Sequence, residues 1–148
     1  MEYRYDGPRT EVSLTRRFHA APHDVFDAWI DPGVASRWLF STPEGSTACE
    51  LDPRPGGSYR ITRTAEGTEY VAVGEYLTLD RPRRLAFTFG MPQFAADVGT
   101  VTVVLRPAAG GTRMDFTQAG LRPGFERETL EGWQRMFDLL ESVLASAT

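Results

Sequence analysis

The feature that most constrains the fold is an amphipathic run near the C-terminal end of the sequence. After Pro123 and Gly124, large apolar residues recur at helical spacing, at Leu130, Trp133, Phe137, Leu140 and Leu144. Three further apolar residues widen this stripe: Met136, Leu139 and Val143. The pattern predicts a helix of about six turns, roughly twice the average length. A helix of this length needs a large apolar surface to cover its stripe.

That surface has to come from the preceding segment, because residues 47–120 carry strand and turn signals. Short alternating runs are separated by turn sequences rich in Gly, Pro and Asp, which is typical of an antiparallel meander. With an alternating run near the N-terminus, seven strands are expected at 10–19, 48–52, 58–64, 68–79, 84–90, 98–106 and 112–118. Residues 91–97 form a looser stretch between two of these strands.

Two short helices are expected between the first strand and the second. Pro22 can open a helix because an N–H at that position would be unpaired anyway. Asp24 lies in the first turn, where the helix dipole favours a carboxylate. Asp31 and Pro32 end this helix and begin another, which continues to about Leu39. The order is therefore β-α-α-β-β-β-β-β-β-α, an α+β fold in one domain, residues 1–148.

The twist of a seven-stranded sheet makes it curve, and we expect the long helix to lie across its concave face. A straight helix contacts a curved sheet best near its two ends, so an apolar cavity is expected beneath its middle. The candidates for the wall are Trp29, Trp38, Phe40, Tyr59, Ile61, Tyr76, Phe87, Phe89, Met114, Phe116, Trp133 and Phe137. The alternative for each of them is ordinary core packing.

Strand alternation places a few polar groups on the same face as these apolar residues. Arg63 has the same parity as Ile61, and Gln118 has that of Phe116. Both are candidates for contact with a ligand. Arg16 also falls on the apolar side of its strand. An arginine in such a cavity needs a carboxylate from the protein or a ligand, unless it lies near a strand end and reaches water.

The composition excludes several classes of function. The chain has no lysine, which rules out Schiff-base catalysis, lysine-anchored pyridoxal chemistry and a Walker-type phosphate loop. A net charge of −4 disfavours general nucleic-acid binding. His19 and His23 lie on either side of the break between strand and helix and have no cysteine partner. We therefore expect neither a metal site nor a cofactor.

We expect a cytoplasmic protein. No run approaches the roughly 20 consecutive apolar residues of a membrane span, and the N-terminal residues lack the apolar centre of a secretory signal. Cys49 is the only cysteine, so an internal disulfide cannot form.

A series of short motifs resembles one known superfamily. The motifs are RF at 17–18, APHDVF at 21–26, DP at 31–32, RWL at 37–39, RPGGSYR at 54–60, GEY at 74–76, DRPRRL at 80–85, FTF at 87–89, GTRM at 111–114 and GW at 132–133. In this order they resemble the START-like superfamily called SRPBCC, and within it the proteins that share the activator domain of the heat-shock protein 90 ATPase. The resemblance spans nearly the whole chain and implies a helix-grip fold, in which a curved antiparallel sheet clasps the C-terminal helix.

The resemblance does not imply one activity, because relatives include chaperone activators, lipid carriers and polyketide aromatase/cyclases. Our leading hypothesis is the binding of a small hydrophobic or aromatic ligand, neutral or acidic, in the cavity. One alternative is a cofactor-independent aromatase/cyclase or dehydratase, acting on a polyketide or aromatic substrate, that polarises a carbonyl with a tyrosine such as Tyr59 or Tyr76 or with an arginine in the cavity. The other is a chaperone-cofactor interaction module. Whether the chain forms a homodimer stays open.

Overall fold

The computed structural model describes residues 7–41, 47–91 and 98–146. Within these ranges the elements are β1 (Thr10–Phe18), α1 (Pro22–Ile30), α2 (Pro32–Ala35), β2 (Ala48–Leu51), β3 (Ser58–Ala65), β4 (Thr68–Asp80), β5 (Arg84–Phe89), β6 (Gly99–Ala108), β7 (Gly111–Leu121) and α3 (Glu126–Ser146). The predicted α+β class and the predicted order of elements are confirmed. Apart from Met91, the looser stretch expected at 91–97 lies outside the described residues.

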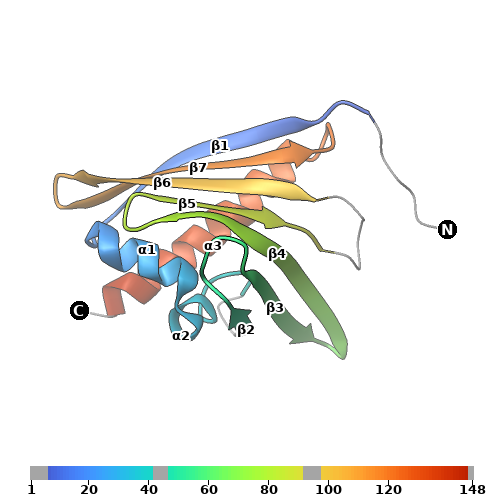
Figure 1. Cartoon of the computed structure of the whole chain (residues 1–148), viewed down its shortest axis with the longest axis horizontal. Helices are drawn as coiled ribbons and strands as arrows, with labels where there is room; N and C mark the ends of the chain where they lie inside the picture. Colours follow the sequence, from blue (N-terminus) through green and yellow to red (C-terminus); the bar gives the residue numbers. More distant parts are fainter. Residues whose placement is uncertain (1–6, 42–46, 92–97, 147–148) are drawn as a thin grey trace.

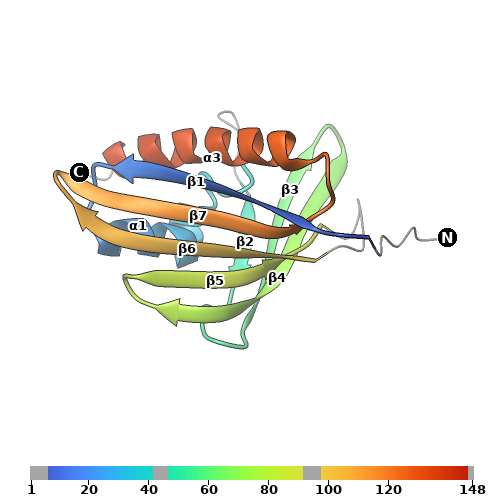
Figure 2. The same cartoon turned by 90° about the horizontal axis from the view of Figure 1, so that it is seen from above.

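The strands form one sheet in the order β1-β7-β6-β5-β4-β3-β2, and each neighbouring pair is antiparallel. β1 and β2 are its edges, so the sheet is open. Figure 1 shows α3 crossing behind the strands from the end of β7 toward α1. Figure 2, seen from above, shows β1 and β7 running alongside α3 while the β3–β4 hairpin turns back toward the helix. This is the helix-grip arrangement that the motifs imply.

The apolar stripe of α3 is buried against the sheet, as its spacing predicts. Trp133, Phe137, Leu140, Val143 and Leu144 are all at most 8% exposed. The opposite face carries charged residues such as Asp138 and Glu141. No helix within the described ranges, α3 included, combines the length and apolarity that a membrane span requires.

The second short helix is shorter than predicted. α2 ends at Ala35, and residues 36–40 continue as turns. Phe40 closes this segment with a φ of 55°, in the left-handed region that cannot continue a right-handed helix. Its backbone N–H donates to the sulfur of Met136 on α3, at 3.1 Å. This contact fixes Phe40 beside the long helix.

Gly74 lies where β4 passes closely between β3 and β5. Residues 68–75 of β4 pair with β3 and residues 76–80 pair with β5, while Val73 also forms a bridge with Gly90. A Cβ on Gly74 would lie 1.9 Å from the carbonyl oxygen of Thr88. The same oxygen accepts a hydrogen bond from the hydroxyl of Tyr59, at 2.8 Å. The close approach of β4 and β5 therefore requires a residue without a side chain at this position.

We predict that Gly74→Ala lowers the free energy of unfolding by about 1–3 kcal/mol, because the added methyl group must push two backbone segments apart. Gly132→Ala on α3 is the matched control, since its Cβ would meet only the Arg135 guanidinium at 4.0 Å. That control should be neutral or stabilising by up to about 1 kcal/mol. Urea denaturation measures the free energy of unfolding of both variants. Equal values would contradict the claim that the close approach of β4 and β5 requires a glycine at position 74.

Candidate ligand-binding site

Aromatic rings fill much of the interface between sheet and helix, where the sequence predicts a gap beneath the centre of α3. The ring of Trp29 lies 4.8 Å from that of Trp38, 5.9 Å from that of Trp133 and 6.0 Å from that of Phe137, measured between centroids. Phe116 packs on Trp133 at 4.6 Å. Large rings supplied by α1, α3 and β7 occupy the space that the curvature opens.

A small residual space lies at one border of this cluster. It measures about 10 Å³ and is lined by residues that include Trp29, Tyr59, Tyr76 and Phe87. The indole N–H of Trp29 is buried without a hydrogen-bond partner in the described structure. A space of this size is far too small for an organic ligand.

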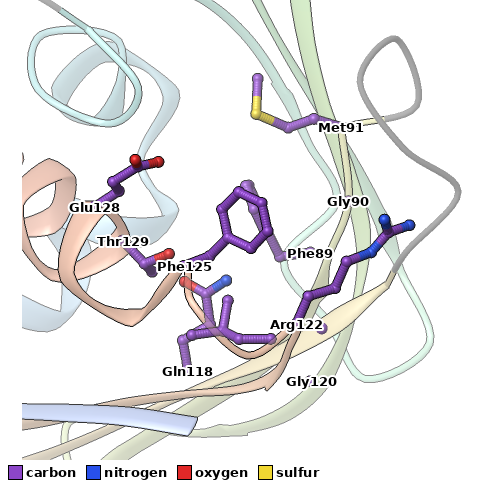
Figure 3. A pocket seen from close by; sticks show the side chains of 11 residues that line it. Phe89, Gly90, Met91, Gln118, Gly120, Arg122, Phe125, Glu128 and Thr129 are labelled. Atoms are coloured by element: carbon purple, nitrogen blue, oxygen red, sulfur yellow. The ribbon is translucent and has the colours of Figure 1, made fainter. Parts of the chain in front are cut away.

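An opening lies at one end of the interface, where α3 begins (Figure 3). It measures about 650 Å³. Its apolar wall consists of Phe89, Met91, Leu121 and Phe125, and its other lining residues are Gly90, Gly99, Gln118, Gly120, Arg122, Glu128 and Thr129. Figure 3 shows the Phe125 ring projecting into this opening, between the start of α3 and the strands. We call it the mouth cavity.

A second pocket of about 420 Å³ lies next to the mouth cavity, and Met91 lines both. Its lining is Phe40, Ser41, Ile61, Arg63, Tyr70, Ala72, Met91, Gly132, Arg135 and Met136. The rings of Phe40 and Phe89 stack with 5.1 Å between their centroids. Phe89 lines the mouth cavity and Phe40 lines this second pocket. We call this second space the side pocket.

Gln118 connects the mouth cavity to the aromatic core. Its side chain is 5% exposed and its amide oxygen accepts a hydrogen bond from the indole N–H of Trp133, at 2.7 Å. Nearby, Gly120 has a φ of 89°, and a Cβ there would lie 3.0 Å from the Cα of Gly99. The two glycines let the ends of β6 and β7 approach and leave the cavity wall free of side chains.

Removing either partner of the Gln118–Trp133 bond should leave a buried polar group unpaired. We predict that Gln118→Leu lowers the free energy of unfolding by about 1–3 kcal/mol. Combined with Trp133→Phe, it should cost less than the sum of the two single changes. Thr117→Val, on the opposite side of β7, is the control and should change stability by less than about 0.5 kcal/mol. If the two single changes in the free energy of unfolding add up to that of the double variant, the Gln118–Trp133 hydrogen bond does not contribute to stability.

Arg16 is neutralised by the protein itself. Its guanidinium lies 2.7 Å from Asp138 and 3.4 Å from Glu141, both on α3, and its side chain is 20% exposed. Among the alternatives that the sequence left open for Arg16, pairing with protein carboxylates is the one observed. Arg16 is therefore not available to a ligand in the interface.

The two tyrosines considered for catalysis are buried. Tyr59 donates its hydroxyl hydrogen to the carbonyl oxygen of Thr88, so this hydrogen is not free to polarise a substrate carbonyl. Burial raises the pKa of Tyr59 and of Tyr76 well above the usual range. Both hydroxyls therefore stay protonated at neutral pH and cannot act as bases there.

The structure divides the predicted cavity residues into two groups. Phe89 and Gln118 line the mouth cavity, and Phe40, Ile61 and Arg63 line the side pocket. The others line neither space: Trp29, Tyr59, Tyr76 and Phe87 border the small residual space, and Trp38, Met114, Phe116, Trp133 and Phe137 are buried in the core.

Sequence reasoning missed the residues at the start of α3. Phe125 and Thr129 line the mouth cavity, and Gly132 and Arg135 line the side pocket. Part of their signal was present in the sequence, because Thr129 and Gly132 are small residues among the large apolar residues of the helix. Glu128, which is exposed, also lines the mouth cavity.

No three His, Cys, Asp or Glu side chains in the described part of the chain come together as a metal site would require. His19 lies just after β1, and His23 is in the first turn of α1.

A family model for activator of Hsp90 ATPase homolog 1-like proteins matches residues 19–145. The chain belongs to this family. The matched segment runs from just after β1 nearly to the end of α3, so both spaces lie within the family's domain. None of the curated proteins compared with it is a match.

Solved structures share the fold of this chain. A protein from Chromobacterium violaceum is 28% identical with a TM-score of 0.79, over 90% of this chain and 96% of that one. A protein of unknown function from Staphylococcus aureus is 22% identical with a TM-score of 0.85, over 96% of this chain and 97% of that one. A protein from Nitrosomonas europaea is 24% identical with a TM-score of 0.80, over 93% of this chain and 96% of that one. These likenesses establish the architecture and leave the activity to be inferred from the site.

Proposed function

We propose that this protein binds a small hydrophobic or aromatic molecule in the mouth cavity, at the start of α3. The observation that carries the proposal is the size and lining of that cavity. Its volume of about 650 Å³ lies within the usual range of small-molecule sites, roughly 300–1,000 Å³. Such sites combine a mostly apolar wall with a few polar groups, as Phe89, Met91 and Phe125 do here beside Gln118 and Thr129.

Phe125 supplies a physical reason for binding. Its side chain is 51% exposed although it projects into the cavity. A ligand in the cavity would remove part of this ring and of Phe89 from water, and each Å² of apolar surface covered contributes about 25 cal/mol. The aromatic core beneath is already packed, so the protein would rearrange little on binding.

The lining supports binding rather than catalysis. Gln118 already accepts the hydrogen bond of Trp133, so its amide oxygen is oriented before any ligand arrives. Tyr59 and Tyr76 lie on the small residual space and not on the mouth cavity. A ligand in the mouth cavity would therefore meet an apolar wall and the fixed Gln118 amide, beside Arg122, Glu128 and Thr129.

The neutral fluorophore N-phenyl-1-naphthylamine tests the proposal, since its emission rises when it leaves water. We predict saturable binding of one molecule per chain. Thr129→Phe should weaken this binding by about tenfold or more, because the added ring occupies the cavity. Gln134→Phe is the matched control, as the same ring placed on the exposed face of α3 should leave the affinity unchanged.

Absence of saturable binding to the wild-type protein would overturn the proposal. An equal effect of Thr129→Phe and Gln134→Phe would also overturn it, since the dye would then bind elsewhere. Near-ultraviolet circular dichroism of each variant verifies that the aromatic core is intact.

A further inference from the structure

We infer that the side pocket is a subsite for an anionic group, so that the preferred ligand is a hydrophobic acid. This inference rests on the proposed function and adds the chemical class of the ligand. Its basis is a pair of arginines, Arg63 on β3 and Arg135 on α3, that line the same apolar pocket from opposite sides of the interface.

Arg63 is held in place without being neutralised. It lies opposite Tyr70 in the register of β3 and β4, and its guanidinium carbon is 4.9 Å from the centre of the Tyr70 ring. An aromatic face orients a guanidinium but carries no formal charge. No carboxylate pairs with Arg63 in the described residues. By contrast, Arg60 on the same strand lies 3.8 Å from Glu69.

Arg135 is likewise the unpaired arginine of its helix within the described residues. Arg127, two turns earlier, is bonded to Glu131 at 3.0 Å. The guanidinium of Arg135 instead lies near Gly132, one turn back, where a Cβ would be 4.0 Å from its terminal nitrogen. The glycine leaves room for a ligand group beside this guanidinium.

The contrast with Arg16 shows what the side pocket lacks. Two carboxylates of α3 surround Arg16, whereas the side pocket holds two guanidinium groups and no Asp or Glu in its described lining. Two like charges facing one space repel each other, and one bound anion relieves this repulsion for both. Guanidinium groups also bind planar or tetrahedral oxyanions through paired hydrogen bonds.

The remaining lining defines the rest of the ligand. Phe40, Ile61, Ala72 and Met136 give the side pocket apolar walls, which do not suit a fully hydrated anion. Met91 lines both spaces, so an acid anchored between Arg63 and Arg135 can extend its apolar body toward the mouth cavity. An aromatic or aliphatic acid therefore fits better than an inorganic ion.

A matched pair of fluorophores tests this inference. 8-Anilinonaphthalene-1-sulfonate is N-phenyl-1-naphthylamine with an added sulfonate, which stands in for the ligand's anionic group. We predict that the wild-type protein binds the sulfonated dye about tenfold more tightly than the neutral one. Arg63→Gln and Arg135→Gln should each remove several-fold of this preference, and the double variant should remove most of it, while binding of the neutral dye stays within about twofold.

Arg60→Gln and Arg127→Gln are the controls, because each removes an arginine that already has a carboxylate partner. Both should retain the preference for the sulfonated dye. Arg63→Lys keeps the charge but loses the paired donors, so it should retain an intermediate preference. Thermal denaturation confirms that each variant is folded.

The outcomes separate the two proposals. Equal affinity of the wild-type protein for both dyes would overturn the anionic subsite while leaving the proposed function in place. Loss of preference in the Arg60→Gln and Arg127→Gln controls would overturn it too, since net charge would then explain the effect. If neither dye binds, the proposed function itself fails.

Discussion

The structure depends on how α3 fills the concave side of the sheet. Along its C-terminal two thirds the helix presents Trp133, Phe137, Leu140 and Leu144, which are all buried. Toward its start, Thr129 lines the mouth cavity and Gly132 lines the side pocket, and Phe125 lies just before the helix. The small side chains at Thr129 and Gly132 leave space beside the helix, whereas the large buried side chains fill it.

This arrangement separates stability from recognition. The cluster around Trp29 supplies a close-packed centre, in which a ligand would have to displace several rings. The open end is backed by that centre through the hydrogen bond from Trp133 to Gln118. Charge is divided in the same way, because carboxylates of α3 neutralise Arg16 near the solid part, whereas Arg63 and Arg135 face the open part.

The sequence was sufficient for the fold because its signals were local. Alternation in the strands, Pro22 at a helix start and the spacing of Trp133 and Phe137 each depend on near neighbours. The position of the cavity was not predictable in this way. It depends on the volumes of side chains from α1, α3 and β7 that meet only after folding, as Trp29, Phe116 and Trp133 do. Parity correctly placed Arg63 and Gln118 on the inner face, but it could not reveal that Arg16 would meet Asp138.

The central claim is that a ligand occupies the open end and leaves the filled middle unchanged. The methionine methyl groups report on both regions, because Met91 lines both spaces, Met136 lines the side pocket, and Met114 is fully buried. In a ¹³C-methyl-methionine NMR titration with 8-anilinonaphthalene-1-sulfonate, the account predicts large shifts for Met91 and Met136 and little change for Met114. A dominant shift of Met114 with Met91 unaffected would contradict it.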